Sequence, residues 1–144
     1  MQIDDIHNEW SIDSQIDRTE LGAESIKIPQ LHAKYFKFFS NERLRLKQHE
    51  QKYKILYRQL HEYYMGSIDE EEQTELGWEP QPLKILKQDI PMYIDAHKDI
   101  IDLNLRIAMQ KEKIDLLDSI IRSVINRGFQ IKNAIDWEKF KHGN

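Results

Sequence analysis

A basic stretch interleaved with aromatic residues lies in the first half of the sequence. Residues 34–58 contain eight Lys or Arg side chains and only two acidic ones. Lysine and arginine neutralise phosphates and release counterions, while tyrosine and phenylalanine rings stack on bases without demanding a particular sequence. These residue types together predict a surface that binds single-stranded nucleic acid. The candidate contacts are Lys34, Arg43, Arg45, Lys47, Lys52, Lys54 and Arg58.

The same stretch also has a simpler interpretation. At about 100° per residue, Lys47, Lys54 and Arg58 share one face of a helix, whereas Tyr35 and Tyr53 lie largely on its packing stripe. Many of the aromatic side chains are therefore expected in the core. Lys and Arg are ordinary residues of helix surfaces, so a solvated basic face on a coiled-coil-like helix also fits the pattern.

The distribution of charge favours the binding interpretation over the solvated face. The chain has a formal net charge of -4, which by itself argues weakly against nucleic acid. Residues 1–33 hold two basic and seven acidic side chains. Residues 59–82 hold no basic and seven acidic side chains. The basic stretch thus lies between two acidic segments, and a ring of subunits would repeat it and gain avidity.

No combination of residues indicates catalysis or a cofactor. The chain has no cysteine, and none of its six histidines lies three or four residues from another, so no helix face presents two imidazoles to a metal. Neither GxxxxGK[ST] nor GxGxxG occurs, and the DEEE run at residues 69–72 lacks the spacing of a calcium loop. We predict a protein that is not an enzyme and holds no metal or cofactor.

The elements that position the basic residues are expected to be helices. Asp5–Trp10 reads as a short leading helix, and Thr19 reads as the N-cap of a second that ends near Pro29. Between Pro29 and Met65 there is no internal glycine or proline, and apolar residues recur at helical spacing. We predict one helix over residues 29–65, about 54 Å long.

The second half of the sequence predicts a loop followed by two further helices. Residues 66–82 are acidic, contain glycine and proline and lack periodicity, which indicates an exposed loop. Pro91 can open a long helix that Gly128 ends, because glycine suits the left-handed backbone after a helix. A final short helix is expected from Phe129 to Phe140.

The long helix that begins at Pro91 carries two apolar stripes, whereas a surface helix needs one. Two stripes indicate contact with its own chain on one side and with a neighbouring subunit on the other. A fully central helix in a monomer is the alternative. The candidate residues of an oligomer interface are Ile100, Leu103, Ile107, Ile114, Leu117, Ile121 and Val124, with Phe129 and Trp137 from the final helix. The second stripe comprises Ile94, Ile101, Leu105, Ala108, Leu116 and Ile120.

Three segments of the sequence are distinctive: DRTELGAESIKIPQLHAKY at residues 17–35, LHEYYMG at residues 60–66 and RGFQIKNAIDWEKF at residues 127–140, followed by Gly143. Together they resemble the UvsY family of recombination mediator proteins of tailed phages. The resemblance covers nearly the full length, and the acidic loop is the least similar part.

The resemblance implies an all-helical ring, hexameric or heptameric, that binds single-stranded DNA in the cytoplasm of the infected host. It further implies help in displacing the phage single-stranded DNA-binding protein and in loading a UvsX-like recombinase. Lys34, Arg43, Lys54 and Arg58 match basic positions of the family. Leu60 departs from it, since the family has a basic residue there, and the patch is then expected to move toward Lys47 and Lys52.

The fold class that follows is all-α, with long antiparallel helices forming a hairpin and short flanking helices, assembled into a homo-oligomeric ring. We expect one domain over residues 1–144, in which the family's assembly helices correspond to about residues 91–140. No apolar run is long enough to cross a membrane. The alternative function is a coiled-coil adaptor or scaffold that binds an acidic protein surface and no DNA.

Overall fold

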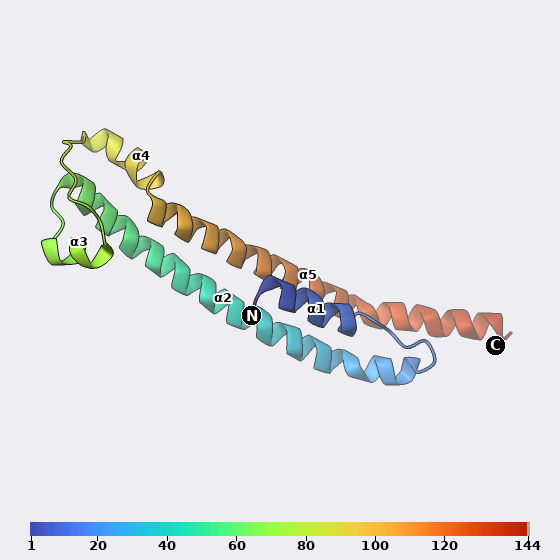
Figure 1. Cartoon of the computed structure of the whole chain (residues 1–144). Helices are drawn as coiled ribbons and strands as arrows, with labels where there is room; N and C mark the ends of the chain where they lie inside the picture. The colour runs from blue at the N-terminus through green and yellow to red at the C-terminus, as the bar shows by residue number, and fades with distance from the viewer. Residues whose placement is uncertain (144) are drawn as a thin grey trace. The chain divides into compact units, whose positions relative to one another are not determined.

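The computed structural model of the chain describes residues 1–143, and these residues form helices and no strand (Figure 1). This confirms the all-α prediction. The elements in chain order are α1 (Ile3–Asp13), α2 (Leu21–Met65), α3 (Glu70–Leu76), a 3-10 turn (Lys87–Asp89), α4 (Ile90–Asp95) and α5 (Lys98–Lys141).

The leading helix α1 is longer than the predicted Asp5–Trp10. It is extended at its start by Gln2, whose backbone N–H donates to the Asp5 carboxylate at 2.8 Å. Asp4 and Asp5 in the first turn also complement the positive end of the helix dipole. Ile6 is the buried residue of α1.

Helix α2 runs through Pro29, so the predicted helix end at this proline is wrong. A proline inside a helix lacks one backbone hydrogen bond and costs about 3 kcal/mol. The neighbouring residues Ile28 and Leu31 pack against a hydrophobic core, and this burial offsets the cost. The helix therefore begins at Leu21, well before the predicted start at residue 29.

Helix α5 continues through Gly128, where the sequence predicted a stop and a separate final helix. Gly128 has no positive φ, unlike Gly66, Gly77 and Gly143. Buried side chains recur on both sides of it, at Val124, Arg127 and Ile131. This helical spacing of buried groups keeps the chain helical past a residue of poor helix propensity.

The prediction of a loop over the whole acidic segment 66–82 is wrong, because this segment contains α3. The Asp69 side chain accepts a hydrogen bond from the Glu72 backbone N–H at 3.4 Å and caps the helix. Three glutamates in the first turn suit the helix dipole. Gly77, with φ of 73°, ends the helix in the left-handed conformation.

The predicted long helix from Pro91 is interrupted near its start. Pro91 lies in the first turn of the short helix α4, in agreement with the expected role of proline at a helix start. Helix α4 ends at Asp95, and α5 begins at Lys98. Ala96 and His97 lie between them.

The chain divides into two compact units. Unit 1 comprises residues 1–44 and the chain from Gln110 onward, and unit 2 comprises residues 45–109. The core of unit 1 contains Ile6, Tyr35, Leu117, Ile120, Ile121 and Val124. The core of unit 2 contains Leu60, Ile90, Ile94 and Ile100, with Tyr53, Leu56, Tyr57, Tyr63, Tyr64, Trp78 and Ile85 packed against it. A single domain over the whole chain stays a prediction.

Within unit 1, α2 and α5 run antiparallel. The Gln110 side-chain amide donates to the backbone carbonyl of Glu42 at 2.8 Å and to its carboxylate at 2.5 Å. Earlier on α2, Tyr35 shares the core with Val124, which lies later on α5. Since positions that advance along one helix meet positions that retreat along the other, the predicted antiparallel pair is present.

Candidate nucleic-acid interface

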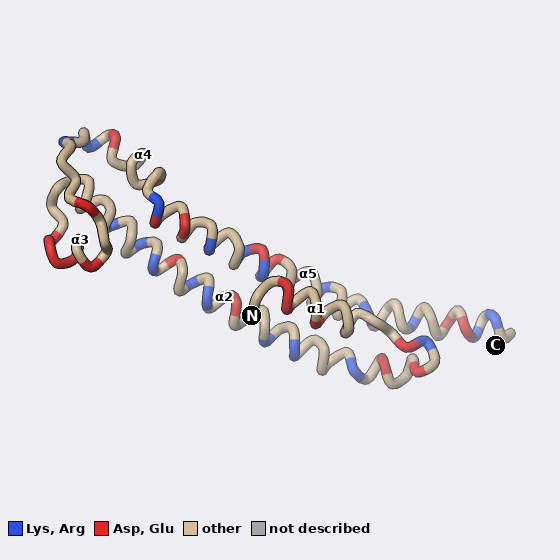
Figure 2. The backbone as a smooth tube through the Cα atoms, viewed as in Figure 1, with Lys and Arg blue, Asp and Glu red and all other residues tan. Residues whose placement is uncertain are grey.

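The predicted contact residues that fall in unit 2 lie on the exposed surface of α2. Blue segments recur along α2 in Figure 2, and the five candidates in this unit are all exposed. They are Arg45, Lys47, Lys52, Lys54 and Arg58. The only acidic residue between the first and the last of them is Glu50, which is half-buried. This helix surface is therefore strongly positive over almost four turns.

The five cations form two rows along α2. At about 100° per residue, Lys47, Lys54 and Arg58 fall on one row, and Arg45 and Lys52 fall on another roughly 140° around the helix. Between the rows lies a band that includes Ile55, whose side chain is 54% exposed. An apolar side chain flanked by cations suits a strand that places phosphates on lysine and arginine and bases on hydrocarbon.

The aromatic residues of α2 in unit 2 serve packing rather than the basic surface. Tyr53 and Tyr57 are half-buried, with ring centroids 6.2 Å apart, and both pack against the core of unit 2. Tyr63 and Tyr64 do the same further along. These four rings are therefore not available to stack on bases at this surface. This agrees with the expectation that many of the aromatic side chains lie in the core.

Lys34, in unit 1, has partners within its own chain. Its ammonium group lies 2.6 Å from a carboxylate oxygen of Glu9 and 2.6 Å from one of Asp13, both on α1. Burial opposes its charge, but the hydrogen bonds to Asp13 and Glu9 outweigh burial and raise the pKa of Lys34. The side chain attaches α1 to α2, so a phosphate would have to displace two carboxylates to reach it.

Arg43, also in unit 1, is exposed and rests against an aromatic ring. The carbon of its guanidinium lies 5.4 Å from the centre of the Phe39 ring, within the range of a cation–π contact. Its place on the surface is compatible with the predicted role in binding.

Arg58 is held between two acidic side chains. One nitrogen donates to both carboxylate oxygens of Glu62, at 3.0 and 2.9 Å, and another donates to Glu72 at 3.3 Å. These hydrogen bonds, first of all the one to Glu62, raise the pKa of the arginine. Glu62 lies one helical turn away and could have been expected from the spacing. Glu72 belongs to α3, in the segment that the sequence predicts to be a loop.

The chain matches the model of the family described as "Recombination, repair and ssDNA binding protein UvsY" over residues 9–144. It belongs to the UvsY family. The match covers nearly the whole chain, and it confirms the resemblance seen in the three sequence segments. A search among curated proteins found no match.

Solved structures of a UvsY protein have the same fold as this chain. In lattice type II, the bacteriophage T4 recombination mediator protein UvsY superposes with a TM-score of 0.85 at 22% identity, covering 99% of this chain and 98% of that one. In lattice type IV the TM-score is 0.85 at 21% identity, with coverage of 97% and 99%. In lattice type I it is 0.83 at 22% identity, with coverage of 95% and 98%.

In this UvsY-family chain, most residues of the predicted oligomer interface lie inside the chain. Ile100, Leu103, Leu117, Ile121 and Val124 are buried, and Ile107 and Ile114 are half-buried. Phe129 and Trp137 are 67% and 57% exposed. The large apolar side chains that α5 leaves exposed are Ile101, Leu105, Met109, Ile125, Phe129, Trp137 and Phe140. The first stripe thus faces the chain's own core, while the second is split, with Ile94 and Ile120 buried.

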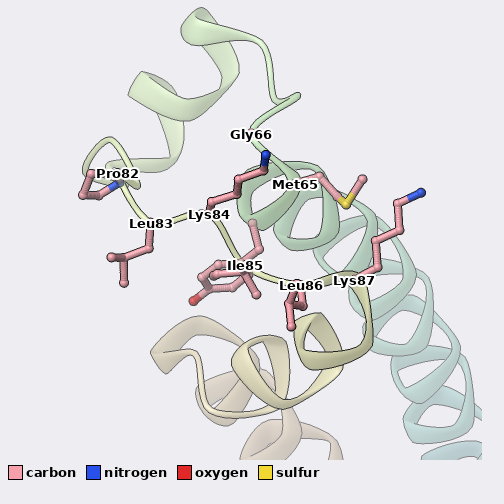
Figure 3. A pocket seen from close by; sticks show the side chains of 9 residues that line it. Met65, Gly66, Pro82, Leu83, Lys84, Ile85, Leu86 and Lys87 are labelled. Carbon is pink, nitrogen blue, oxygen red and sulfur yellow. The ribbon is translucent and has the colours of Figure 1, made fainter.

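Unit 2 also contains a cavity of about 530 Å³ beside the C-terminal end of α2 (Figure 3). Its lining is mostly apolar and includes two cations, Lys84 and Lys87. Lys84 extends toward Gly66, and Lys87 points away from it (Figure 3). The lining residues are Tyr64, Met65, Gly66, Pro82, Leu83, Lys84, Ile85, Leu86 and Lys87.

Among residues 1–143, no three His, Cys, Asp or Glu side chains are placed to hold a metal ion together. No described helix combines the length and the apolar character needed to span a bilayer.

Proposed function

We propose that this UvsY-family chain is a recombination mediator that binds single-stranded DNA through the basic surface of α2 in unit 2. It acts in homologous recombination, repair and recombination-dependent replication. The observation that supports this is the group of five exposed cations within fourteen residues of one helix, in a chain of a family described by single-stranded DNA binding. No reaction and no cofactor are needed, since binding and release of the strand suffice.

The strand is bound mainly by its phosphates. Lys47 and Lys54 are exposed on one row, and among residues 1–143 neither forms an ion pair. Each phosphate contact on a single strand contributes about 0.7 to the slope of log affinity against log salt. Binding should therefore weaken steeply as salt is raised and depend little on base sequence.

A fluorescence anisotropy titration with a labelled oligonucleotide tests this interface. The double variant Lys47→Glu with Lys54→Glu should bind roughly tenfold or more weakly and should lower the salt slope by at least about 1.4, for two lost contacts. The matched control is Lys111→Glu with Lys132→Glu, which reverses two exposed lysines of α5. Equal affinity of the α2 variant and the unchanged protein would refute binding at this surface.

The mediator activity is proposed to consist of promoting recombinase loading onto strands covered by the phage single-stranded DNA-binding protein. A UvsX-like recombinase and that binding protein are the proposed partners, in the cytoplasm of the infected host. Filament nucleation on covered strands should be slower with the α2 double variant than with the α5 control. Loading at an unchanged rate by a variant that no longer binds DNA would contradict the mechanism.

Assembly into a hexamer or heptamer is proposed to bring several basic surfaces onto one strand. Linked sites gain affinity by effective concentration, without any new contact. The exposed apolar residues of α5, including Phe129 and Trp137, are the proposed contacts between copies. Light scattering should give a mass several times that of the 17.4 kDa chain, and a stable monomer would refute the assembly.

The cavity in unit 2 favours a second candidate function, that of an adaptor. Its apolar lining with Lys84 and Lys87 complements an acidic peptide that carries a bulky apolar side chain. An adaptor of this kind would show no measurable affinity for oligonucleotides in the anisotropy titration. It would also be insensitive to the reversal of Lys47 and Lys54.

A further inference from the structure

The acidic segment after α2 folds back onto the basic helix within unit 2. Residues 59–82 contain seven acidic side chains and no Lys or Arg. Figure 2 shows the acidic residues of α3 beside the end of α2. The contact is specific, because one carboxylate oxygen of Glu72 accepts from Arg58 at 3.3 Å and from the Gln59 side-chain amide at 2.9 Å.

Glu72 is held in this position by packing of the segment that follows it. The Trp78 indole N–H donates to the Asp99 carboxylate at 2.8 Å, and the Tyr63 hydroxyl donates to the backbone carbonyl of Glu79 at 2.5 Å. The Gln73 side chain donates to the carbonyl of Trp78 at 3.2 Å. The position of α3 on α2 therefore does not depend on the ion pair with Arg58 alone.

The two carboxylates around Arg58 occupy donors that a phosphate would use. A guanidinium carries five N–H groups in a planar fork that suits either carboxylate or phosphate oxygens. Glu62 accepts from one terminal nitrogen of Arg58 and Glu72 from the other. A DNA phosphate that binds Arg58 through both terminal nitrogens competes with these two carboxylates for the same nitrogens. Exposed ion pairs are weak, so a phosphate can compete, but the competition lowers affinity.

We propose that Glu72 sets the affinity of the nucleic-acid interface by competing with DNA phosphate for Arg58. The inference rests on the proposed function, since it requires the basic surface of α2 to bind the strand. Glu72 acts through Arg58 and is a positioning residue that need not touch DNA. The affinity for the strand at this end of α2 is lower than the number of cations alone would predict. The strand dissociates faster as a result.

Substitution of Glu72 tests the competition, with Glu75 as the matched control on the same short helix. Glu72→Gln should bind an oligonucleotide about two- to fivefold more tightly, as expected for the loss of an exposed ion-pair competitor. Glu75→Gln removes the same charge from an exposed position with no recorded contact to Arg58 and should change affinity clearly less. Equal gains from both variants would overturn the proposal, because they would reflect net charge alone.

Two further variants keep the test independent of net charge and of folding. Glu72→Asp retains the charge but shortens the side chain, so it should also tighten binding if the contact matters. In an Arg58→Gln background, Glu72→Gln should give no gain. A full gain in that background would overturn the proposal. Circular dichroism checks that α3 stays packed in each variant, together with Trp78 fluorescence in a Trp10→Phe, Trp137→Phe background in which Trp78 alone emits.

The outcomes separate this inference from the proposed function. If Lys47→Glu with Lys54→Glu does not weaken binding, the interface itself is wrong. If that variant weakens binding but Arg58→Gln or Glu72→Gln has no effect, the interface stands and the competition is refuted.

Discussion

The two units of the chain close their cores by different means. Unit 1 packs α1 against α2 and α5 and surrounds one carboxylate, that of Asp13, with donors. Unit 2 packs aromatic rings around one imidazole, that of His97. The ordinary pKa values of the groups around Asp13 lie far from neutrality, and that of histidine lies close to it. We therefore expect unit 1 to lose stability at alkaline pH and unit 2 to lose stability at mildly acidic pH.

The polar cluster of unit 1 ties three helices together. One oxygen of Asp13 accepts from Lys34 at 2.6 Å and from the Tyr35 hydroxyl at 2.7 Å. Arg127, which is buried, donates to the backbone carbonyl of Asp13 at 2.6 Å and lies 5.6 Å from the Trp10 ring centre. Burial disfavours the charge of Asp13, but the hydrogen bonds from Lys34 and Tyr35 outweigh burial and lower its pKa.

The aromatic cluster of unit 2 is built around the break between α4 and α5. The ring of His97 lies 5.2 Å from that of Trp78, 6.5 Å from Tyr63 and 6.3 Å from Tyr64, measured between centroids. The Asp99 backbone N–H donates to Nδ1 of His97 at 3.0 Å. Burial lowers the pKa of His97, and the nearby Asp99 carboxylate opposes this only in part.

The largest expected effect comes from the aliphatic core of unit 1. Leu117 is fully buried, so Leu117→Ala should lower the free energy of unfolding by about 2–5 kcal/mol through lost burial and a cavity. Urea unfolding followed by circular dichroism measures it. The control Ser119→Ala, at an exposed position of α5, should stay within about 0.5 kcal/mol. A loss below about 1 kcal/mol for Leu117→Ala would contradict the assigned core.

Removal of the Tyr35 hydroxyl should give the next largest effect. Tyr35→Phe takes one donor from the Asp13 carboxylate and should lower the free energy of unfolding by about 1.5–3 kcal/mol, the range for hydrogen bonds to charged groups. The same urea titration measures it. Tyr57→Phe removes the hydroxyl of a half-buried tyrosine in unit 2 and serves as the control, with a smaller expected loss. Equal losses would remove the distinction between the two clusters.

Alkaline pH should weaken unit 1 through the same cluster. Burial and the Asp13 carboxylate raise the pKa of Tyr35 above its ordinary 10.0, and Lys34 is raised above 10.5. Because both folded-state values are raised, their stabilisation is complete below about pH 10 and is lost as pH rises beyond it. Tyr35→Phe should make this loss shallower in unfolding measurements from pH 9 to about 11. An unchanged slope would contradict the role of Tyr35.

The smallest expected effect is the response of unit 2 to mild acid. Because the pKa of His97 is lowered below 6.5 in the folded state, the unfolded chain binds the proton more tightly. Stability is therefore complete above about pH 6.5 and declines as pH falls through the folded-state pKa. Trp78 fluorescence, measured with Trp10 and Trp137 replaced by Phe, should report the loosening, and His97→Gln should abolish its pH dependence. A pH response that persists in His97→Gln would assign the titration to another group.

Much of the fold could be predicted from residue spacing alone. The lack of glycine and proline between Pro29 and Met65 correctly indicated the long basic helix, and alternating segments of charge located the exposed cations. The errors at Pro29 and Gly128 share one cause. Proline and glycine predict helix ends from local propensity alone. The packing of Ile28, Val124 and their neighbours overrides that propensity and keeps both helices continuous.

The candidate site was only partly predictable, because the sequence shows which side chains are charged but not which opposite charges they pair with. Lys34 and Lys54 look alike in sequence, yet Lys34 meets two carboxylates of α1 about two dozen residues earlier in the chain. Glu72 reaches Arg58 only because Asp69 and Gly77 cap a helix in an apparent loop. Both caps are visible in the sequence, so the missed helix was recoverable, whereas the long-range ion pairs were not.

The division of the chain has a consequence for the order in which the protein folds during synthesis. Unit 2 is one continuous segment, residues 45–109, whereas unit 1 needs residues 1–44 together with the chain from Gln110 onward. Joining distant segments carries a larger loop-closure entropy, and local contacts form faster than non-local ones. Unit 2 can therefore form on the ribosome before the part of α5 that completes unit 1 has emerged, and it shortens the effective loop that unit 1 must close.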